Sequence, residues 1–338
     1  MPFDREKMKQ TVAKLASEGV FIGTSSWKYD GWIGQLYTAA RYTKDKKASS
    51  KPQHQDLFAG LQVEAQPPKP EKIDDEKFER DCLGEYAEVF KTVSFDGAYY
   101  KFPSQQYLQS LVAQVPSDFQ FGFKVTGEIT IKRFSGDKRY GQRAGKPNEN
   151  FLSADVFNRA FLHPCESIRG NVGIIMFEFS RFYSSDYEHC DEFVEALDSF
   201  FSKLPSGWPY GIELRNKDWL TPEYFACLTR HGVTHVFNSW EMMPRVSEQM
   251  TLQGSRTNPS LVAARFLLKP GRKYQEAKDT FKPYDLVQDE YPEARRVGKA
   301  LVAEGKDAGP KRKTFIYVNN RLEGNALETI AAMVGQED

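Results

Sequence analysis

The sequence contains few cysteines and few histidines, and this scarcity argues against several classes of site. Its four cysteines show no CxxC spacing, so neither a disulfide framework nor a structural zinc site is expected, and the pattern fits the reduced thiols of a cytoplasmic protein. The five histidines fall in predicted loops and helices or at the start of a predicted strand. A multinuclear zinc centre, which needs several histidines in one place, is therefore not expected.

An excess of charge of one sign and long apolar runs are also missing. Lys and Arg together number 46, as do Asp and Glu, which argues against a wholly basic nucleic-acid binder but leaves room for a local basic patch. No stretch approaches 18 consecutive apolar residues, and the first twenty residues carry charges throughout. We expect neither a membrane span nor an export signal, and hence a cytoplasmic location.

Short apolar or aromatic runs alternate with helical patterns along most of the chain. This alternation predicts a parallel sheet, and eight strand–helix units favour a closed TIM-barrel-like (β/α)8 barrel over an open doubly wound sheet. No glycine-rich dinucleotide fingerprint follows any of the strands, which also disfavours the open sheet. We expect a single domain over 1–338, with the barrel at 20–335. The predicted strands are 20–27, 92–100, 119–128, 172–180, 209–216, 234–240, 261–268 and 313–320.

In such a barrel the functional groups lie at the C-terminal ends of the strands and in the loops that follow. Side chains alternate along a strand, so Glu213 and Arg215 share one face while Ile212 and Leu214 share the other. If the apolar residues face the helices, polar residues of many strands point inward. The predicted inward set is Thr24, Ser26, Ser94, Asp96, Lys124, Glu128, Glu178, Glu213, Arg215 and Arg265, with Asn319 and Asn320 near the same rim.

Basic loops follow several of the predicted strands. Two long insertions, at 38–80 and 132–150, belong to the C-terminal face by their position in the chain. Residues 132–146 contain six Lys or Arg and one Asp. The loop after the seventh strand contributes Arg272 and Lys273, in a place where barrels often bind phosphate. We therefore expect this face to be positive and to bind an anion.

Several ordered blocks of the sequence resemble the YecE-like family, number 72 among the domains of unknown function. The blocks include "GTSSWKYDGWIGQLYT", "YAEVFKTVSFDGAYYKFP", "FQFGFKVTGEITI", "IELRNKDWL" and "VNNRLEGNALETI" and span most of residues 20–332. The resemblance implies a TIM-barrel-like fold and no established activity. The chain departs from the usual pattern of the family at Ser94, Glu178 and Leu267.

The inward charges allow two interpretations, because buried ions are costly unless they are paired. They form either a functional site or an ion network that only stabilises the barrel. In the site hypothesis Glu213 acts as general acid or base, assisted by Glu178, Asp96 and Lys124. The residues expected to bind the substrate are Arg215, Arg265, Arg272, Lys273, Asn319 and Asn320, together with Trp27 and Tyr99 as stacking surfaces that could equally be plain packing.

No cofactor is firmly indicated, although carboxylate oxygens of Asp96, Glu178 and Glu213 could ligate Mg²⁺ or Mn²⁺. Two functional hypotheses stay open at this point. One is an enzyme with hydrolase-type acid/base chemistry on a small anionic substrate that is phosphorylated or nucleotide- or sugar-like. The other is a non-catalytic protein that binds nucleic acid or another anionic partner through its basic face. The sequence does not define an oligomeric state.

Overall fold

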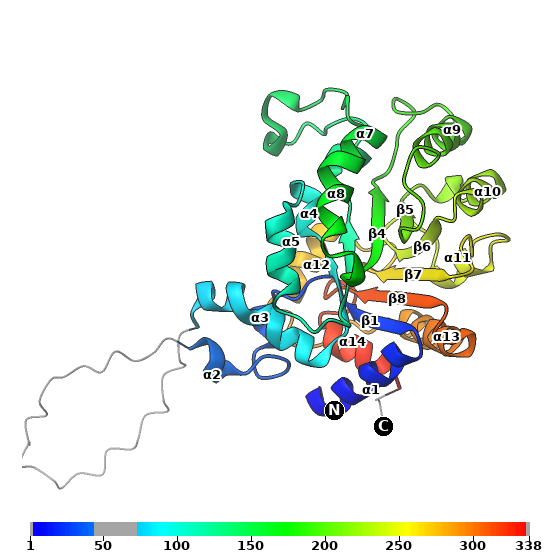
Figure 1. Cartoon of the computed structure of the whole chain (residues 1–338). Coiled ribbons are helices and arrows are strands. Elements are labelled where there is room, and N and C mark those ends of the chain that lie inside the picture. The colour runs from blue at the N-terminus through cyan, green and yellow to red at the C-terminus, as the bar shows by residue number, and fades with distance from the viewer. Residues whose placement is uncertain (1–2, 44–72, 336–338) are drawn as a thin grey trace, which may run out of the picture.

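Eight parallel strands close into a barrel in the order in which they occur along the chain (Figure 1). The computed structural model describes residues 3–43 and 73–335. Each strand pairs with its sequence neighbours, and β8 pairs with β1 to close the cylinder. The predicted (β/α)8 fold is confirmed. The strands are β1 (Val20–Thr24), β2 (Thr92–Phe95), β3 (Gln120–Lys124), β4 (Val172–Phe179), β5 (Tyr210–Leu214), β6 (Thr234–Ser239), β7 (Leu261–Phe266) and β8 (Lys313–Val318).

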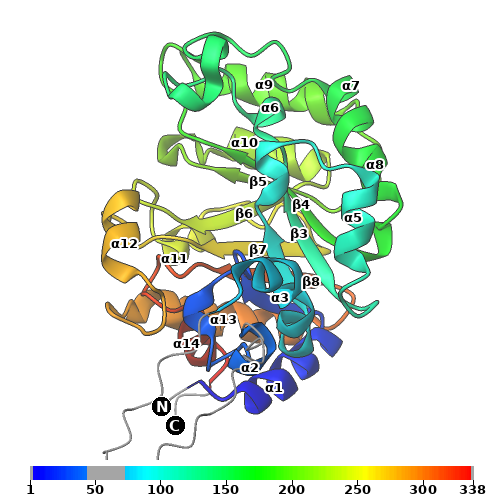
Figure 2. The ribbon, with the colours of Figure 1, turned by 90° about the vertical axis from the view of Figure 1, so that its left-hand side faces the viewer.

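Helices surround the strands on all sides in the view of Figure 2. No helix of residues 3–43 and 73–335 combines the length and the apolarity that are needed to cross a bilayer. The α-helices are α1 (Arg5–Ser17), α2 (Ala39–Tyr42), α3 (Asp75–Val89), α4 (Gly97–Tyr100), α5 (Gln105–Val112), α6 (Gly127–Thr130), α7 (Ala154–Phe157), α8 (His163–Glu166), α9 (Cys190–Phe201), α10 (Pro222–Arg230), α11 (Val246–Thr251), α12 (Tyr274–Phe281), α13 (Pro292–Ala308) and α14 (Ala326–Met333). Short 3-10 or π segments are η1 (Asp30–Trp32), η2 (Lys138–Arg143), η3 (Asn158–Leu162), η4 (Arg169–Asn171) and η5 (Lys217–Trp219).

The barrel interior is apolar toward the N-terminal ends of the strands and charged at their C-terminal ends. Alternate strand residues such as Phe21, Met176 and Tyr317 form a buried cluster that is separate from the larger core between strands and helices. Further along the same inward rows come Glu178 on β4 and Arg265 on β7. Because side chains two apart share a face of a strand, the apolar layer is followed directly by the charged layer.

The first strand has the opposite facing from the one predicted. The hydroxyl oxygen of Thr24 lies 2.9 Å from the Tyr86 hydroxyl, on helix α3, so Thr24 points out of the barrel. The inward residues of β1 are Phe21 and Gly23. A Cβ at Gly23 would overlap the Thr92 carbonyl, so the absence of a side chain allows β1 to lie close against β2. The inward placement of Thr24 was therefore wrong, since a shift of one residue changes every facing. Ser26 lies beyond the end of β1, so its inward placement stays a prediction.

Strands β2 and β3 end earlier than the sequence pattern indicated. Short helices α4 and α6 begin where the predicted strands would have continued, and Glu128 lies on α6. Its carboxylate accepts hydrogen bonds from Arg143, at 2.8 Å, and from the side chain of Asn150, at 2.9 Å. Glu128 is therefore not an inward strand residue as predicted. It anchors the excursion that follows.

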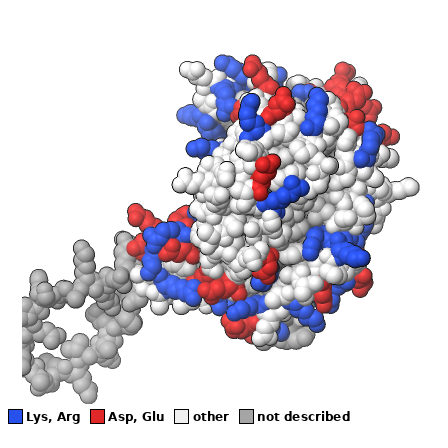
Figure 3. Space-filling model, in the orientation of Figure 1, with Lys and Arg blue, Asp and Glu red and all other residues white. Residues whose placement is uncertain are grey.

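Residues 132–150 form this excursion, which is held as a loose hairpin. Backbone hydrogen bonds join Phe134 to Lys146 and Asn148 to Lys132, and Phe134 is buried beneath Tyr140. Lys and Arg side chains gather over it at the upper left of Figure 3, whereas acidic side chains gather over α9 at the upper right. Of the other predicted insertion, at 38–80, residues 44–72 lie outside the described residues.

Candidate functional site

Six charged side chains meet at the C-terminal end of the barrel, and we name them the mouth network. Their parallel strands bring them to the same end of the barrel: Glu178 and Glu213 are register partners on β4 and β5, and Arg265 lies on β7. Three members are basic and three are acidic, so the formal charges of the group cancel. The members are Asp96, Lys124, Glu178, Glu213, Arg215 and Arg265.

Arg265 contacts all three carboxylates of the mouth network. Its Nη1 atom donates to Glu178, at 2.9 Å, and to Glu213, and its Nη2 atom lies 3.3 Å from Oδ1 of Asp96. The side chain is only 2% exposed. Burial alone would lower the pKa of Arg265, but the attraction of Glu213, Asp96 and Glu178 outweighs it and raises the pKa well above the usual range. Arg265 therefore stays charged and fixes the positions of the acids.

Arg215 extends the network toward the rim of the barrel. Its Nε and Nη2 atoms donate to Oε1 of Glu213 at 3.0 and 2.9 Å, and Nη2 also lies 2.9 Å from Glu178. The guanidinium stacks over the Trp240 ring, 3.7 Å from its centroid. A flat guanidinium between an aromatic ring and two carboxylates loses little further freedom when it binds an anion.

Lys124 is held between an acid and an aromatic ring. Its Nζ atom lies 2.8 Å from Glu178 and 3.8 Å from the centroid of Tyr99. Burial opposes ionisation of Glu178, but the charges of Arg215, Lys124 and Arg265 prevail and lower the pKa of this carboxyl well below its usual range. Glu178 is therefore an anion near neutral pH and does not act as a proton donor.

Glu213 does not have the geometry that we expected for a general base. Its side chain is 0% exposed, one oxygen accepts from Arg215, and the other accepts from Arg265. A general base needs a lone pair that reaches the substrate. Glu213 instead positions two arginines.

Asp96 is the accessible acid of the network. It follows β2, its side chain is 37% exposed, and its only ion pair within the described chain is the one from Oδ1 to Arg265. The other carboxylate oxygen, Oδ2, has no hydrogen-bond or ion-pair partner among the described residues.

Three more predicted residues are engaged in local structure. The indole of Trp27 is buried and stacks on Phe95. The amide oxygen of Asn319 accepts from the backbone N–H of Arg321, and that of Asn320 accepts from Ala326 at the start of α14. The two asparagines thus shape the chain between β8 and α14.

Arg272 and Lys273 lie apart from the mouth network. Arg272 pairs with Asp289 and donates to the Leu322 carbonyl at 2.9 Å. Burial lowers its pKa. Lys273 is the exposed residue that precedes α12. No ion pair or hydrogen bond in the described part of the chain links either residue to Glu178, Glu213 or Arg265. Their role in anion binding therefore stays a prediction, and their position does not connect it to the mouth network.

The carboxylates of the mouth do not form a set of metal ligands. Those of Glu178 and Glu213 are occupied by Lys and Arg side chains, and Arg265 stands where an ion shared by the acids would bind. Elsewhere in the described residues, the side chains of Asp198, Cys227 and His231 place ligand atoms within 4.8 Å of one another, but Asp198 is already paired with Arg230 and His231. The Mg²⁺ or Mn²⁺ hypothesis does not fit the mouth.

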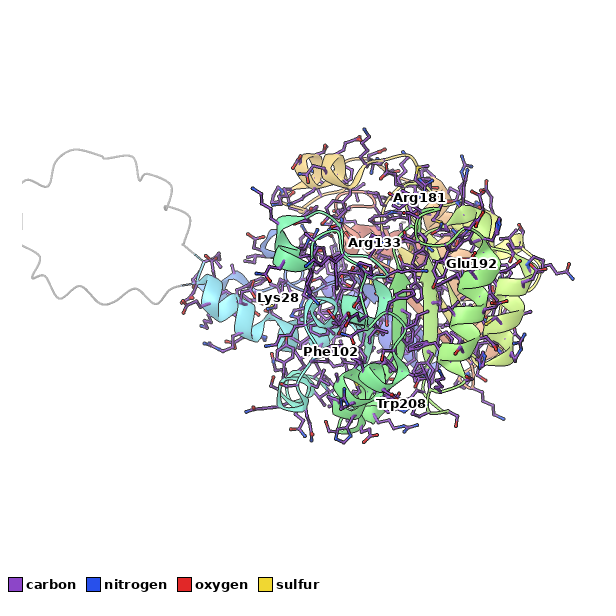
Figure 4. The ribbon with its side chains drawn as sticks, turned by 90° about the horizontal axis from the view of Figure 1, so that it is seen from above. Lys28, Phe102, Arg133, Arg181, Glu192 and Trp208 are labelled. Carbon is purple, nitrogen blue, oxygen red and sulfur yellow. The ribbon has the colours of Figure 1, made fainter. Side chains whose placement is uncertain are left out.

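Sequence reasoning missed the part of the site that lies in loops. A cavity of about 270 Å³ lies beside Arg215 and is lined by Arg181, Lys217, Trp219 and other loop residues. Arg181 follows β4, and it lies at the opposite end of the strands from Trp208, which precedes β5 (Figure 4). The position of these residues just after strand ends was the available signal.

The fold and the mouth network define a (β/α)8-barrel protein with a charged, partly accessible C-terminal site. The chain belongs to the family described as "Protein of unknown function DUF72", whose model matches residues 73–337. The predicted resemblance to the YecE-like family, another name for the same family, is confirmed. A comparison with curated proteins gives no match.

Solved structures of the family share the fold. A DUF72 family protein from Enterococcus faecalis V583 is 18% identical, with a TM-score of 0.59 over 94% of this chain and 96% of that one. A DUF72 family protein from Thermotoga maritima MSB8 is 17% identical, with a TM-score of 0.55 over 94% of this chain and 98% of that one. At these identities the likeness establishes the barrel and no activity.

Proposed function

We propose that the chain is an enzyme that binds a small anionic substrate at the mouth of the barrel and acts on it by hydrolase-type acid/base chemistry. The observation that carries this proposal is the position of Asp96. It is the most exposed carboxylate of the network, and it is paired through one oxygen only, to a fixed arginine. A carboxylate held in this way has an oriented lone pair free for proton transfer.

The other members of the network would serve as fixed charges. Lys124 and Arg215 are about one tenth exposed and can stabilise negative charge that develops on the substrate. Glu178 and Glu213 hold these cations and Arg265 in place, so they need not reorganise during the reaction. This replaces the role that the sequence led us to give Glu213.

The test compares Asp96→Asn with the control variant Asp118→Asn. Asp118 has an exposed carboxylate, precedes β3 and pairs with Lys91. Both variants and the wild type are assayed on phosphomonoesters, phosphodiesters and glycosides that carry a nitrophenyl leaving group. Loss of a general acid or base lowers turnover by about 10²-fold or more. We expect this loss for Asp96→Asn alone, with an unchanged melting temperature. Equal turnover in the two variants would contradict the proposal.

A second function, the binding of single-stranded nucleic acid, is favoured by exposed aromatic residues on the same face. Tyr100 and Tyr274 are 74% and 42% exposed, and Arg321 lies over the Tyr274 ring at 4.7 Å. Aromatic rings interleaved with cations are typical of stacking platforms for bases. In that case the affinity for single-stranded nucleic acid falls steeply as the salt concentration rises, and Asp96→Asn leaves this affinity unchanged.

A further inference from the structure

A cavity at the rim of the mouth has the features of a ligand subsite. It lies between the loops that follow β4, β5 and β6, and its volume of about 270 Å³ is close to the lower end of the range of small-molecule sites. Its lining includes Arg181, Tyr183, Arg215, Lys217 and Met242. Arg215 belongs both to this cavity and to the mouth network, so a ligand bound here contacts a member of the network.

The walls of the cavity are tied together by reciprocal hydrogen bonds. The side chain of Asn216 donates to the Phe182 carbonyl at 3.0 Å and accepts from the Phe182 N–H at 2.9 Å. Trp219 stacks on Phe182 with ring centroids 5.5 Å apart and an interplanar angle of 17°. These contacts join the β4 loop to the β5 loop. The cavity is thus preformed rather than a chance gap between independent loops.

The charge around the cavity favours an anion. Arg181 and Lys217 are exposed and form no ion pair with any carboxylate of residues 3–43 and 73–335. Arg215 binds its two carboxylates through Nε and Nη2. Asp218 is the one acidic residue in the lining. Because the charge of Arg215 is already balanced within the mouth network, Arg181 and Lys217 against Asp218 leave the cavity with one net positive charge.

The cavity also presents apolar surface that the protein leaves uncovered. Tyr183 is 61% exposed and Met242 is 51% exposed, and both belong to the small set of large apolar side chains that are exposed in the described chain. A flat ring can stack on tyrosine, and methionine adapts to aromatic ligands. The ligand therefore combines an anionic group with a planar ring.

We infer that this cavity binds a nucleotide unit, with its phosphate on Arg181, Arg215 and Lys217 and its base against Tyr183 and Met242. The inference rests on the proposed function, because it names the substrate class of the same site. It also accounts for two exposed cations, Arg181 and Lys217, that have no acidic partner among the described residues. The Arg181 guanidinium already lies over the Tyr183 ring, 5.5 Å from its centroid.

Calorimetric titration of the full-length protein with AMP, ribose 5-phosphate and adenosine tests the inference. We expect AMP to bind at least 10-fold more tightly than either fragment, because only AMP uses both halves of the cavity. Arg181→Ala and Lys217→Ala should each weaken AMP binding about 10-fold, since each removes a charge-assisted contact to phosphate. Tyr183→Ala should reduce AMP binding to the level of ribose 5-phosphate. Lys203→Ala, which removes an exposed lysine that follows α9, serves as the control and should have no effect.

Two results would overturn the inference. One is AMP binding no tighter than that of ribose 5-phosphate, and the other is AMP binding that is unchanged in Arg181→Ala and Lys217→Ala. The separate titration of Asp96→Asn distinguishes this failure from that of the proposed chemistry. If Asp96→Asn binds AMP normally but keeps full turnover, the acid/base role fails and the subsite stands. If it loses turnover while AMP binds no better than its fragments, the subsite fails and the acid/base role stands.

Discussion

At the scale of single residues, Arg265 and Glu213 show how a buried charge is tolerated in the barrel. Each is almost fully enclosed, and each depends on the other for compensation. Removal of one partner of a buried pair leaves the other uncompensated, which costs about 3–5 kcal/mol.

Glu213→Gln should therefore lower the free energy of unfolding by about 3–5 kcal/mol, because Arg215 and Arg265 lose one of the two carboxylates that they share. Urea denaturation at neutral pH measures this change. The matched control is Glu79→Gln, which breaks an exposed pair with Lys28 and should cost less than about 1 kcal/mol. Similar costs for the two variants would show that the mouth network contributes little to stability.

The buried side chain of His235 should make the stability of the protein depend on pH. His235 is buried among aromatic rings, and burial lowers its pKa to about 3. In the unfolded chain the imidazole of His235 binds a proton near pH 6.5. Its full contribution to the free energy of unfolding is therefore present above that pH and is lost as the pH falls toward 3. Between pH 6.5 and pH 5 the expected loss is about 2 kcal/mol.

His235→Phe removes this titration and should flatten the curve of unfolding free energy against pH over that interval. His163→Gln, a change at an exposed histidine, should leave the curve unaltered. An equally steep curve in His235→Phe would mean that other groups cause the acid sensitivity.

The sequence predicted which residues face the barrel interior more accurately than it predicted the roles of those residues. Alternation along β4, β5 and β7 correctly brought Glu178, Glu213 and Arg265 together. The expectation of a catalytic Glu213 did not hold, because the alternation of a strand says nothing about which oxygens are already bonded. Thr24 was misplaced because its outward partner, Tyr86, lies on a helix distant in sequence.

At the scale of elements, glycines on the barrel strands mark close packing inside the cylinder. A Cβ at Gly122 on β3 would overlap the ring and hydroxyl of Tyr317, which itself lies 3.1 Å from the hydroxyl of Thr92. Gly84 in helix α3 differs, because the nearest atom to an added Cβ is the Gln114 carbonyl oxygen at 3.5 Å.

Gly122→Ala should therefore destabilise the protein by about 1–3 kcal/mol through overpacking. Gly84→Ala should stabilise it by up to about 1 kcal/mol, because alanine favours a helix interior. Thermal melts of the two variants check the opposite signs. A stabilising Gly122→Ala would indicate that the barrel interior is loosely packed.

Strand existence and order could be predicted from apolar runs, but strand ends could not. The predicted strands continue to Tyr100 and Glu128, so they hide the points at which the backbone turns into α4 and α6. Asp96 already has helical backbone angles, with φ −84° and ψ −11°. This turn exposes its carboxylate at the mouth, and it is the detail on which the proposed chemistry depends.

At the scale of the whole molecule, the fold brings six charged side chains together at the C-terminal end of the barrel. The helices bury the outer faces of the strands, apolar side chains fill the N-terminal part of the barrel interior, and ionised groups occupy its C-terminal end. The lining of the rim cavity comes from loops, whose conformation depends on long-range contacts such as that of Asn216 with Phe182. The positions after the strand ends place these residues at the C-terminal end of the barrel, but no local pattern predicts how the loops enclose the cavity.

The most direct test of the account is a crystal structure of the full-length protein soaked with inorganic phosphate. The account predicts phosphate density in contact with Arg215 and with Arg181 or Lys217, within the cavity beside the mouth network. Phosphate bound instead at Arg272 and Lys273, with the mouth free of it, would contradict the placement of the substrate site.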